Sequence, residues 1–159
     1  FMKLTIETTG QPQLIRALDN VERGFTDLDQ SGIWKKVQSE FFKVEKELFD
    51  SEGASGQSGA WEKLTDNYAK VKERQFGKLP ILQRSKELFK SLTSETDNTI
   101  ADFKADEATF GTSLPYSGAV HKKRPAISPT DDQIDQICKP IQTELQQLIE
   151  RERLNDVAT

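Results

Sequence analysis

Apolar residues recur every three or four positions in three long stretches of the chain, which is the spacing of one face of an α-helix. These stretches cover residues 12–28, 34–48 and the region from 128 to about 148. We therefore expect a hairpin of two helices near the N-terminus and a long helix at the C-terminus. The three apolar stripes are Leu14, Leu18, Val21, Phe25 and Leu28; Trp34, Val37, Phe41, Val44 and Leu48; and Ile134, Ile137, Ile141, Leu145 and Leu148.

The C-terminal helix carries the clearest start signal. Ser128 precedes a proline and two aspartates, which suit the first turn of a helix. Pro140 lies inside the pattern and removes one backbone hydrogen bond, so we expect a kink there. Cys138 falls beside the apolar stripe and is expected to be a packing thiol.

Shorter patterns predict a small sheet and two short helices. Polar and apolar residues alternate over residues 3–8, 99–103 and 108–111, and the last two segments are close enough for an antiparallel hairpin. Short helices are expected at residues 65–74 and 82–92. The prediction is one α+β domain over 1–159, in which a small, mainly antiparallel sheet packs with the N-terminal helical hairpin and the long kinked C-terminal helix.

Two segments are predicted to be flexible loops. Residues 50–60 are mostly serine, glycine and alanine, which have little side-chain surface to offset the entropy of ordering. Residues 117–127 follow Pro115 and end near Pro125, and they are also expected to lack regular structure.

Composition limits the possible functions. Only 35% of the residues are hydrophobic and the mean hydropathy is −0.66, so the core is expected to be thin or completed by partner chains. No stretch approaches the ~20 apolar residues that cross a bilayer, so we expect a soluble protein that does not contact membranes.

The net charge of −4 hides an uneven distribution. Residues 62–90 hold eight basic and four acidic residues, whereas the segments on either side are acidic. A uniformly basic nucleic-acid binder is excluded, but a local basic face is not. A second basic cluster covers residues 121–124.

Candidate catalytic chemistry is sparse. The chain has one cysteine and one histidine, and its glycines do not form a phosphate-binding loop. His121 lies close in sequence to Ser113 and Ser117, which leaves a small hydrolase as a minor alternative. We expect no enzyme activity, no metal and no cofactor.

A series of motifs resembles the phage virion morphogenesis family, also called tail completion proteins. It begins at Trp61, continues through residues 64–68 (LTDNY) and 80–92 (PILQRSKELFKSL), and then reaches 110–116 (FGTSLPY) and 124–127 (RPAI). The series covers residues 61–137, about half of the chain. Lys86 stands where the family usually has glycine.

The resemblance implies a structural protein of a tailed bacteriophage. Such a subunit completes the tail and joins it to the head connector as a ring, here a hexamer or a dodecamer, with genomic DNA passing through the lumen. Its partners would be itself, the tail tube and the neck proteins. It would reside in the virion, and in the host cytoplasm during assembly.

In this interpretation, large aromatic residues and a basic corner form the contacts between subunits or partners. The alternative function is a nucleic-acid-binding regulator that uses the basic face of residues 62–90. The candidate interface residues are Trp61, Tyr68, Arg84, Tyr116, His121, Lys122, Lys123, Arg124 and Pro125.

Overall fold

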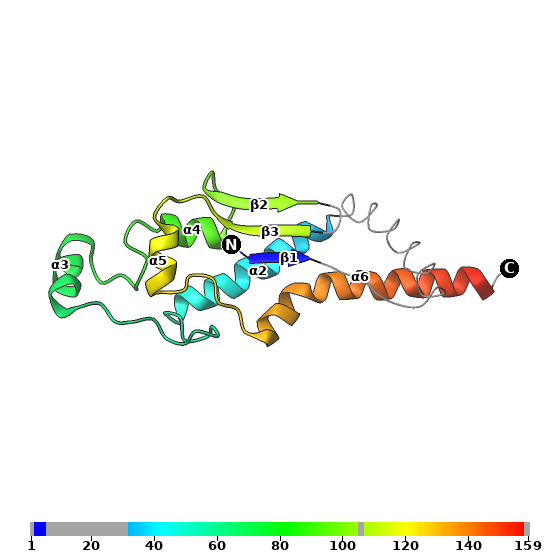
Figure 1. The fold of residues 1–159 in the computed structure, drawn as a ribbon, viewed down its shortest axis with the longest axis horizontal. Coiled ribbons are helices and arrows are strands. Elements are labelled where there is room, and N and C mark those ends of the chain that lie inside the picture. Colours follow the sequence, from blue (N-terminus) through cyan, green and yellow to red (C-terminus); the bar gives the residue numbers. More distant parts are fainter. Residues whose placement is uncertain (1, 6–31, 105–106, 158–159) are drawn as a thin grey trace.

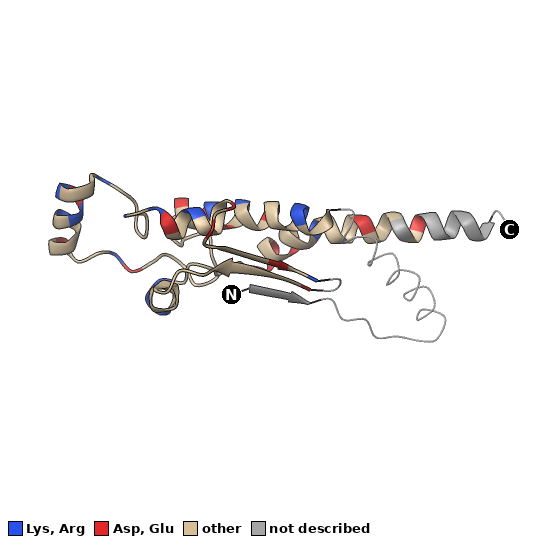
Figure 2. Cartoon of the chain, turned by 90° about the horizontal axis from the view of Figure 1, so that it is seen from above, with Lys and Arg blue, Asp and Glu red and all other residues tan. Residues whose placement is uncertain are grey.

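The computed structural model describes residues 2–5, 32–104 and 107–157, and it has the predicted α+β class. In Figure 2 the strands form one layer and helices α2 and α6 lie in another. The predicted helix at 12–28 lies outside the described residues, as do residues 6–8 of the first predicted strand. The elements are β1 (Met2–Thr5), α2 (Ile33–Asp50), α3 (Asp66–Phe76), α4 (Glu87–Thr93), β2 (Thr99–Phe103), β3 (Glu107–Thr112), α5 (Ser117–Lys123) and α6 (Asp131–Val157).

The sheet has three antiparallel strands in the order β1-β3-β2. The central strand β3 pairs Phe110 with Met2 of β1 and with Ala101 of β2. This arrangement confirms the predicted strand pair at 99–103 and 108–111. Because β3 is paired on both edges, it is the strand on which the core is built.

Helix α2 forms the centre of the molecule, because α4, α6 and the sheet all pack against it. Its predicted apolar stripe is fully buried. Phe41 stacks on Phe110 of β3, with ring centroids 5.1 Å apart, and Phe49 meets the ring of Phe89 edge to face. Periodicity therefore identified the face of α2 correctly.

The buried side of α2 also carries polar groups without partners. The side chain of Glu45 is fully buried, and neither of its carboxylate oxygens has a hydrogen-bond partner among the described residues. Burial raises the pKa of Glu45 well above its usual value, because removal from water disfavours the charged form of the carboxyl group. Trp34 Nε1 and Gln38 Nε2 are also buried, and they too lack hydrogen-bond partners within the described part of the chain.

Helix α6 begins at Asp131, three residues after the predicted cap Ser128, and packs against α2. Ile137 and Ile141 are buried as expected, but Ile134 is 38% exposed, so the predicted stripe is wrong at its first position. Cys138 is half-buried and its pKa is raised by burial. Pro140 lies inside α6, and Figure 1 shows the first turns inclined to the longer remainder.

The segment predicted as a flexible loop at 50–60 has neither helix nor strand after Asp50, the last residue of α2, yet it is tied into the fold. The Gln57 amide donates to the Ser128 carbonyl at 2.8 Å. Gly53 has a φ of +89°, and a Cβ there would lie 2.5 Å from the Trp61 ring, so only glycine fits. Tight turns and these contacts hold the segment against the start of α6.

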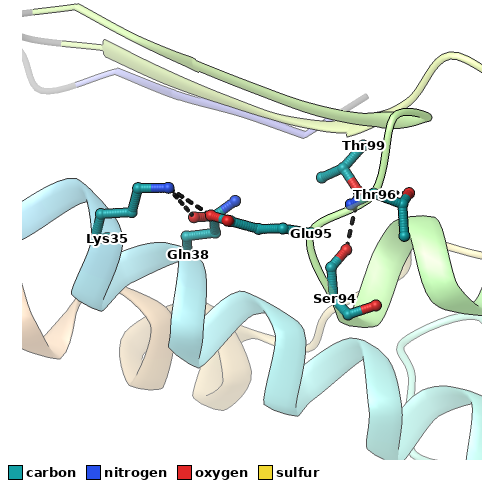
Figure 3. A network of polar contacts seen from close by, with 6 residues as sticks. All are labelled: Lys35, Gln38, Ser94, Glu95, Thr96 and Thr99. Atoms are coloured by element: carbon teal, nitrogen blue, oxygen red, sulfur yellow. Dashed lines mark hydrogen bonds and ion pairs between the residues drawn. The ribbon is translucent and has the colours of Figure 1, made fainter.

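A short polar network fixes the turn between α4 and β2 (Figure 3). The Thr99 hydroxyl donates to the Ser94 carbonyl at 2.9 Å and accepts a hydrogen bond from the Thr96 amide at 3.0 Å. On α2, Lys35 contacts Glu95 of the same turn. The turn is thus held by threonine hydroxyls on one side and an exposed ion pair on the other.

Two predictions for the second half of the chain are wrong in part. The helix expected at 82–92 begins only at Glu87, because Leu82 and Lys86 adopt positive φ angles of 62° and 59°. The loop expected at 117–127 contains helix α5. Neither helix has the long apolar stripe that identified α2.

Candidate functional site

A pocket of about 450 Å³ lies between α3, the segment before α4, and α5. Its walls combine tyrosine, arginine and aliphatic side chains, and we call it the tyrosine–arginine pocket. Since α3 lies at one end of the molecule, apart from the sheet and α2 (Figure 1), the pocket belongs to that end. The lining residues are Leu64, Tyr68, Lys72, Leu82, Arg84, Ser85, Glu87, Leu88, Tyr116, Val120 and Arg124.

Four of the predicted interface residues meet in this pocket. Tyr68 comes from α3, Arg84 from the segment before α4, and Tyr116 from the residue preceding α5, while Arg124 follows α5. The two tyrosines are 44% and 41% exposed. Residues up to 56 positions apart in sequence therefore present aromatic and cationic groups to one hollow.

Arg84 occupies a strained stretch of backbone. Leu82 and Lys86, two residues before and after it, both have the left-handed conformation that non-glycine residues rarely adopt. The Arg84 guanidinium lies 4.6 Å from the centre of the Phe76 ring, which orients it. Strained backbone is concentrated at functional sites, so its presence around Arg84 favours this pocket as one.

Lys72 supports the pocket rather than offering a free charge. Although it belongs to the basic face, its side chain is buried, and its Nζ donates to the carbonyls of Leu79 and Pro80 at 2.9 and 2.6 Å. Burial lowers the pKa of Lys72. The ammonium group thus holds the chain turn after α3, which sequence reasoning did not anticipate.

Arg124 and Trp61 connect the pocket to the rest of the fold. Arg124 Nε donates to the Glu62 carbonyl at 2.9 Å, and Trp61 Nε1 donates to the Pro125 carbonyl at 2.8 Å. Trp61 is 5% exposed and packs edge to face on Phe49. Trp61 is therefore a core residue of this chain, and Pro125 is half-buried beside it.

The remaining predicted residues lie on helix α5 instead of in a loop. His121, Lys122 and Lys123 are exposed, and His121 Nδ1 accepts a hydrogen bond from the Ala126 amide at 3.3 Å. His121 and Lys122 also line a separate pocket of about 260 Å³ beneath α5. Of the nine predicted residues, four line the tyrosine–arginine pocket, two line the smaller pocket and Trp61 lies in the core, whereas Pro125 is half-buried and Lys123 is exposed outside both pockets.

In residues 2–5, 32–104 and 107–157, no group of three or more His, Cys, Asp or Glu side chains has an arrangement that could hold a metal ion. Within the same ranges, no helix combines the length and the apolar character needed to cross a bilayer. What the pocket offers is aromatic surface together with two guanidinium groups.

Sequence reasoning did not predict the structural role of Lys72, and six further lining residues were not among its candidates: Leu64, Leu82, Ser85, Glu87, Leu88 and Val120. The motif at 80–92 marked the right segment, but nothing in it showed which side chains face α5.

Comparisons of the chain with protein-family models, with curated proteins and with solved structures found no match.

Proposed function

We propose that this chain is a structural subunit of a tailed bacteriophage, which completes the tail and joins it to the head connector as a member of a ring. The proposal rests on the resemblance to tail completion proteins. It requires no covalent chemistry. The chain acts by presenting surfaces to neighbouring subunits and to the neck proteins.

The observation that supports the proposal best is that the motif segments contact one another. Trp61 of the first motif donates to Pro125 of the last, and Arg124 binds the carbonyl of Glu62. Ser91, in the middle motif, donates to the hydroxyl of Thr112 at 2.9 Å, and both residues are buried. Segments that recur together in a family are expected to form one structural unit, and these segments do so.

Lys86 supports the resemblance through its backbone. This is the position where the family pattern has glycine, and Lys86 has a φ of 59°. Glycine adopts that conformation without the steric penalty that a Cβ brings. Glycine in the family pattern is therefore compatible with the local geometry that this chain adopts at this position.

The test is to delete the gene from the phage that encodes the chain and to examine the lysate by electron microscopy and mass spectrometry. We expect wild-type particles to contain the chain in several copies, and the deletion lysate to contain unjoined heads and tails that a plasmid copy rescues. Intact infectious particles in the deletion lysate, or particles without the chain, would overturn the proposal.

Exposure of the basic face favours nucleic-acid binding as the second candidate. All basic residues of 62–90 except Lys72 are exposed. A binder of this kind would bind duplex DNA with an affinity that falls steeply with salt, because phosphate contacts release counterions. Fluorescence anisotropy at 50 and 200 mM salt distinguishes it, since a neck subunit without this role would show no binding at either concentration.

A further inference from the structure

The tyrosine–arginine pocket has the composition of a protein contact site. Tyrosine and arginine are enriched where protein interfaces carry most of their binding energy. A hollow of about 450 Å³ accommodates a few side chains. Non-specific nucleic-acid sites instead follow the backbone over several nucleotides. The pocket therefore suits a side-chain ligand better than a nucleic-acid strand.

The charges in the pocket select an acidic ligand. Glu87 is the one acidic residue among the described lining residues, whereas Lys72, Arg84 and Arg124 are cationic. The Lys72 ammonium is already bound to carbonyls, and Arg124 donates from Nε and Nη2 to the carbonyls of Glu62 and Lys63, so Arg84 is the principal cation of the pocket. Leu64, Leu82 and the tyrosines add apolar surface. The complementary ligand is an apolar side chain flanked by carboxylates.

The start of α6 presents such a surface, which we call the acidic ridge: Asp131, Asp132, Ile134 and Asp135. All four side chains are exposed, and no basic residue lies between positions 128 and 138. The helix dipole accounts for carboxylates in a first turn. It does not account for an exposed isoleucine in their midst, which is typical of a contact surface.

The ridge and the pocket belong to different places in one chain. No residue of α6 lines the pocket. Figure 1 shows α3 at one end of the molecule, whereas α6 begins beneath the middle of the fold. Two different complementary surfaces on one chain produce a heterologous contact, which closes into a ring when the rotation between copies permits it.

We infer that the tyrosine–arginine pocket of one copy receives the acidic ridge of a second copy of this chain. The contact places Ile134 against Tyr68 and Tyr116, and carboxylates of the ridge beside Arg84 and Arg124. The inference rests on the proposed ring and specifies the surfaces that form it.

A charge exchange tests the contact by sedimentation velocity over a range of protein concentrations. Arg84→Glu is expected to weaken self-association about tenfold or more. The control Lys90→Glu makes the same charge change at an exposed position outside the pocket and is expected to have little effect. Adding Asp132→Lys and Asp135→Lys to Arg84→Glu should restore association.

The outcomes separate this contact from the proposed function. If the wild-type chain associates and Arg84→Glu behaves like Lys90→Glu, the contact is overturned, while the self-association that a ring requires is retained. A loss of association that the exchange does not restore also overturns it. A wild-type chain that remains monomeric overturns the contact, while the deletion lysate still decides the neck function independently.

Cross-linking gives a direct measurement that does not depend on charge. In a Cys138→Ser background, chains with Ser85→Cys are mixed with chains carrying Ile134→Cys, so that a mixed disulfide can form only between copies. We expect a disulfide-linked dimer under mild oxidation. The control partner is Gln147→Cys, which is exposed elsewhere on α6. Equal yields from the two mixtures would contradict the contact.

Discussion

The body of the molecule and its α3 end are built in opposite ways. In the body, formed by α2, α4 and the sheet, aromatic rings stack on one another and large side chains are almost fully buried. In α3, Val71 is half exposed, Phe76 is 40% exposed, and Lys72 is the one buried residue. Stability therefore resides in the body, whereas the α3 end presents apolar and cationic groups to solvent.

The residues that stabilise the fold therefore lie in the body, whereas the residues that are available to bind another molecule lie at the α3 end. Exposed apolar side chains gathered at one place contribute little to the stability of a single chain, and they are typical of interaction surfaces. Changes in the body should alter the free energy of unfolding. Changes at the α3 end should alter association with little effect on unfolding.

The largest expected effect comes from Phe41→Ala. Removing a ring that stacks on Phe110 should lower the free energy of unfolding by about 3–5 kcal/mol, measured by urea denaturation. The matched control is Phe76→Ala in α3, which should lower it by less than about 1 kcal/mol. Similar losses in the free energy of unfolding from the two variants would contradict the conclusion that stability resides in the body and not at the α3 end.

Glu45→Met should raise the free energy of unfolding by about 1–3 kcal/mol at pH 7, because it removes a buried carboxyl group without partners. The control Glu47→Met changes an exposed residue of the same helix and should have little effect.

The pH dependence of Glu45 gives a second readout. The pKa of Glu45 is raised in the folded state above its ordinary value of 4.5. Between these two values the unfolded chain loses a proton that the folded chain keeps, so ionisation favours unfolding as the pH rises. Wild-type stability should fall relative to Glu45→Met across this window, and parallel pH profiles would contradict the assignment.

Lys86→Gly should raise the free energy of unfolding by about 0.5–1 kcal/mol, because glycine accepts the left-handed conformation without steric cost. Lys86→Ala removes the same charge but keeps a Cβ, so it is expected to change stability less. Thermal denaturation compares the two variants. A glycine variant that is no more stable than the alanine variant would show that the conformation is not strained.

The smallest expected effect is that of Glu95→Gln, which breaks the ion pair with Lys35 (Figure 3). Both side chains are 62% exposed, so the loss should be at most about 0.5 kcal/mol. Thr99→Val in the same turn removes hydroxyl hydrogen bonds and should cost about 1 kcal/mol. A larger loss of stability from Glu95→Gln than from Thr99→Val would mean that the ion pair, rather than the threonine hydroxyls, holds the turn.

Helix α2 could be predicted from sequence because its apolar stripe repeats over several turns and every member of it is buried. Helix α5 could not, since its seven residues include Gly118, lack such a stripe and lie between Pro115 and Pro125. The late start of α4 depends on positive φ angles at Leu82 and Lys86, which the residue types disfavour. The family glycine at Lys86 was the one available signal.

The tyrosine–arginine pocket shows a different limit of prediction from sequence. The sequence identified Tyr68, Arg84, Tyr116 and Arg124 as candidates, but three separate segments had to fold together before they faced one hollow. Trp61 had the same aromatic character, yet its indole packs against Phe49 inside the fold. Residue type alone does not distinguish an aromatic anchor at a surface from one in a core.

The two tryptophans lie in different parts of the molecule, so the fluorescence of each one reports on a different region. Trp34 lies buried in α2, and Trp61 lies at the base of the α3 end, hydrogen-bonded to Pro125. A Trp34→Phe chain would carry a single indole whose emission and lifetime report on this base. That indole reports on the junction between the α3 end and the body, while the remaining indole of a Trp61→Phe chain, Trp34, reports on unfolding of the body.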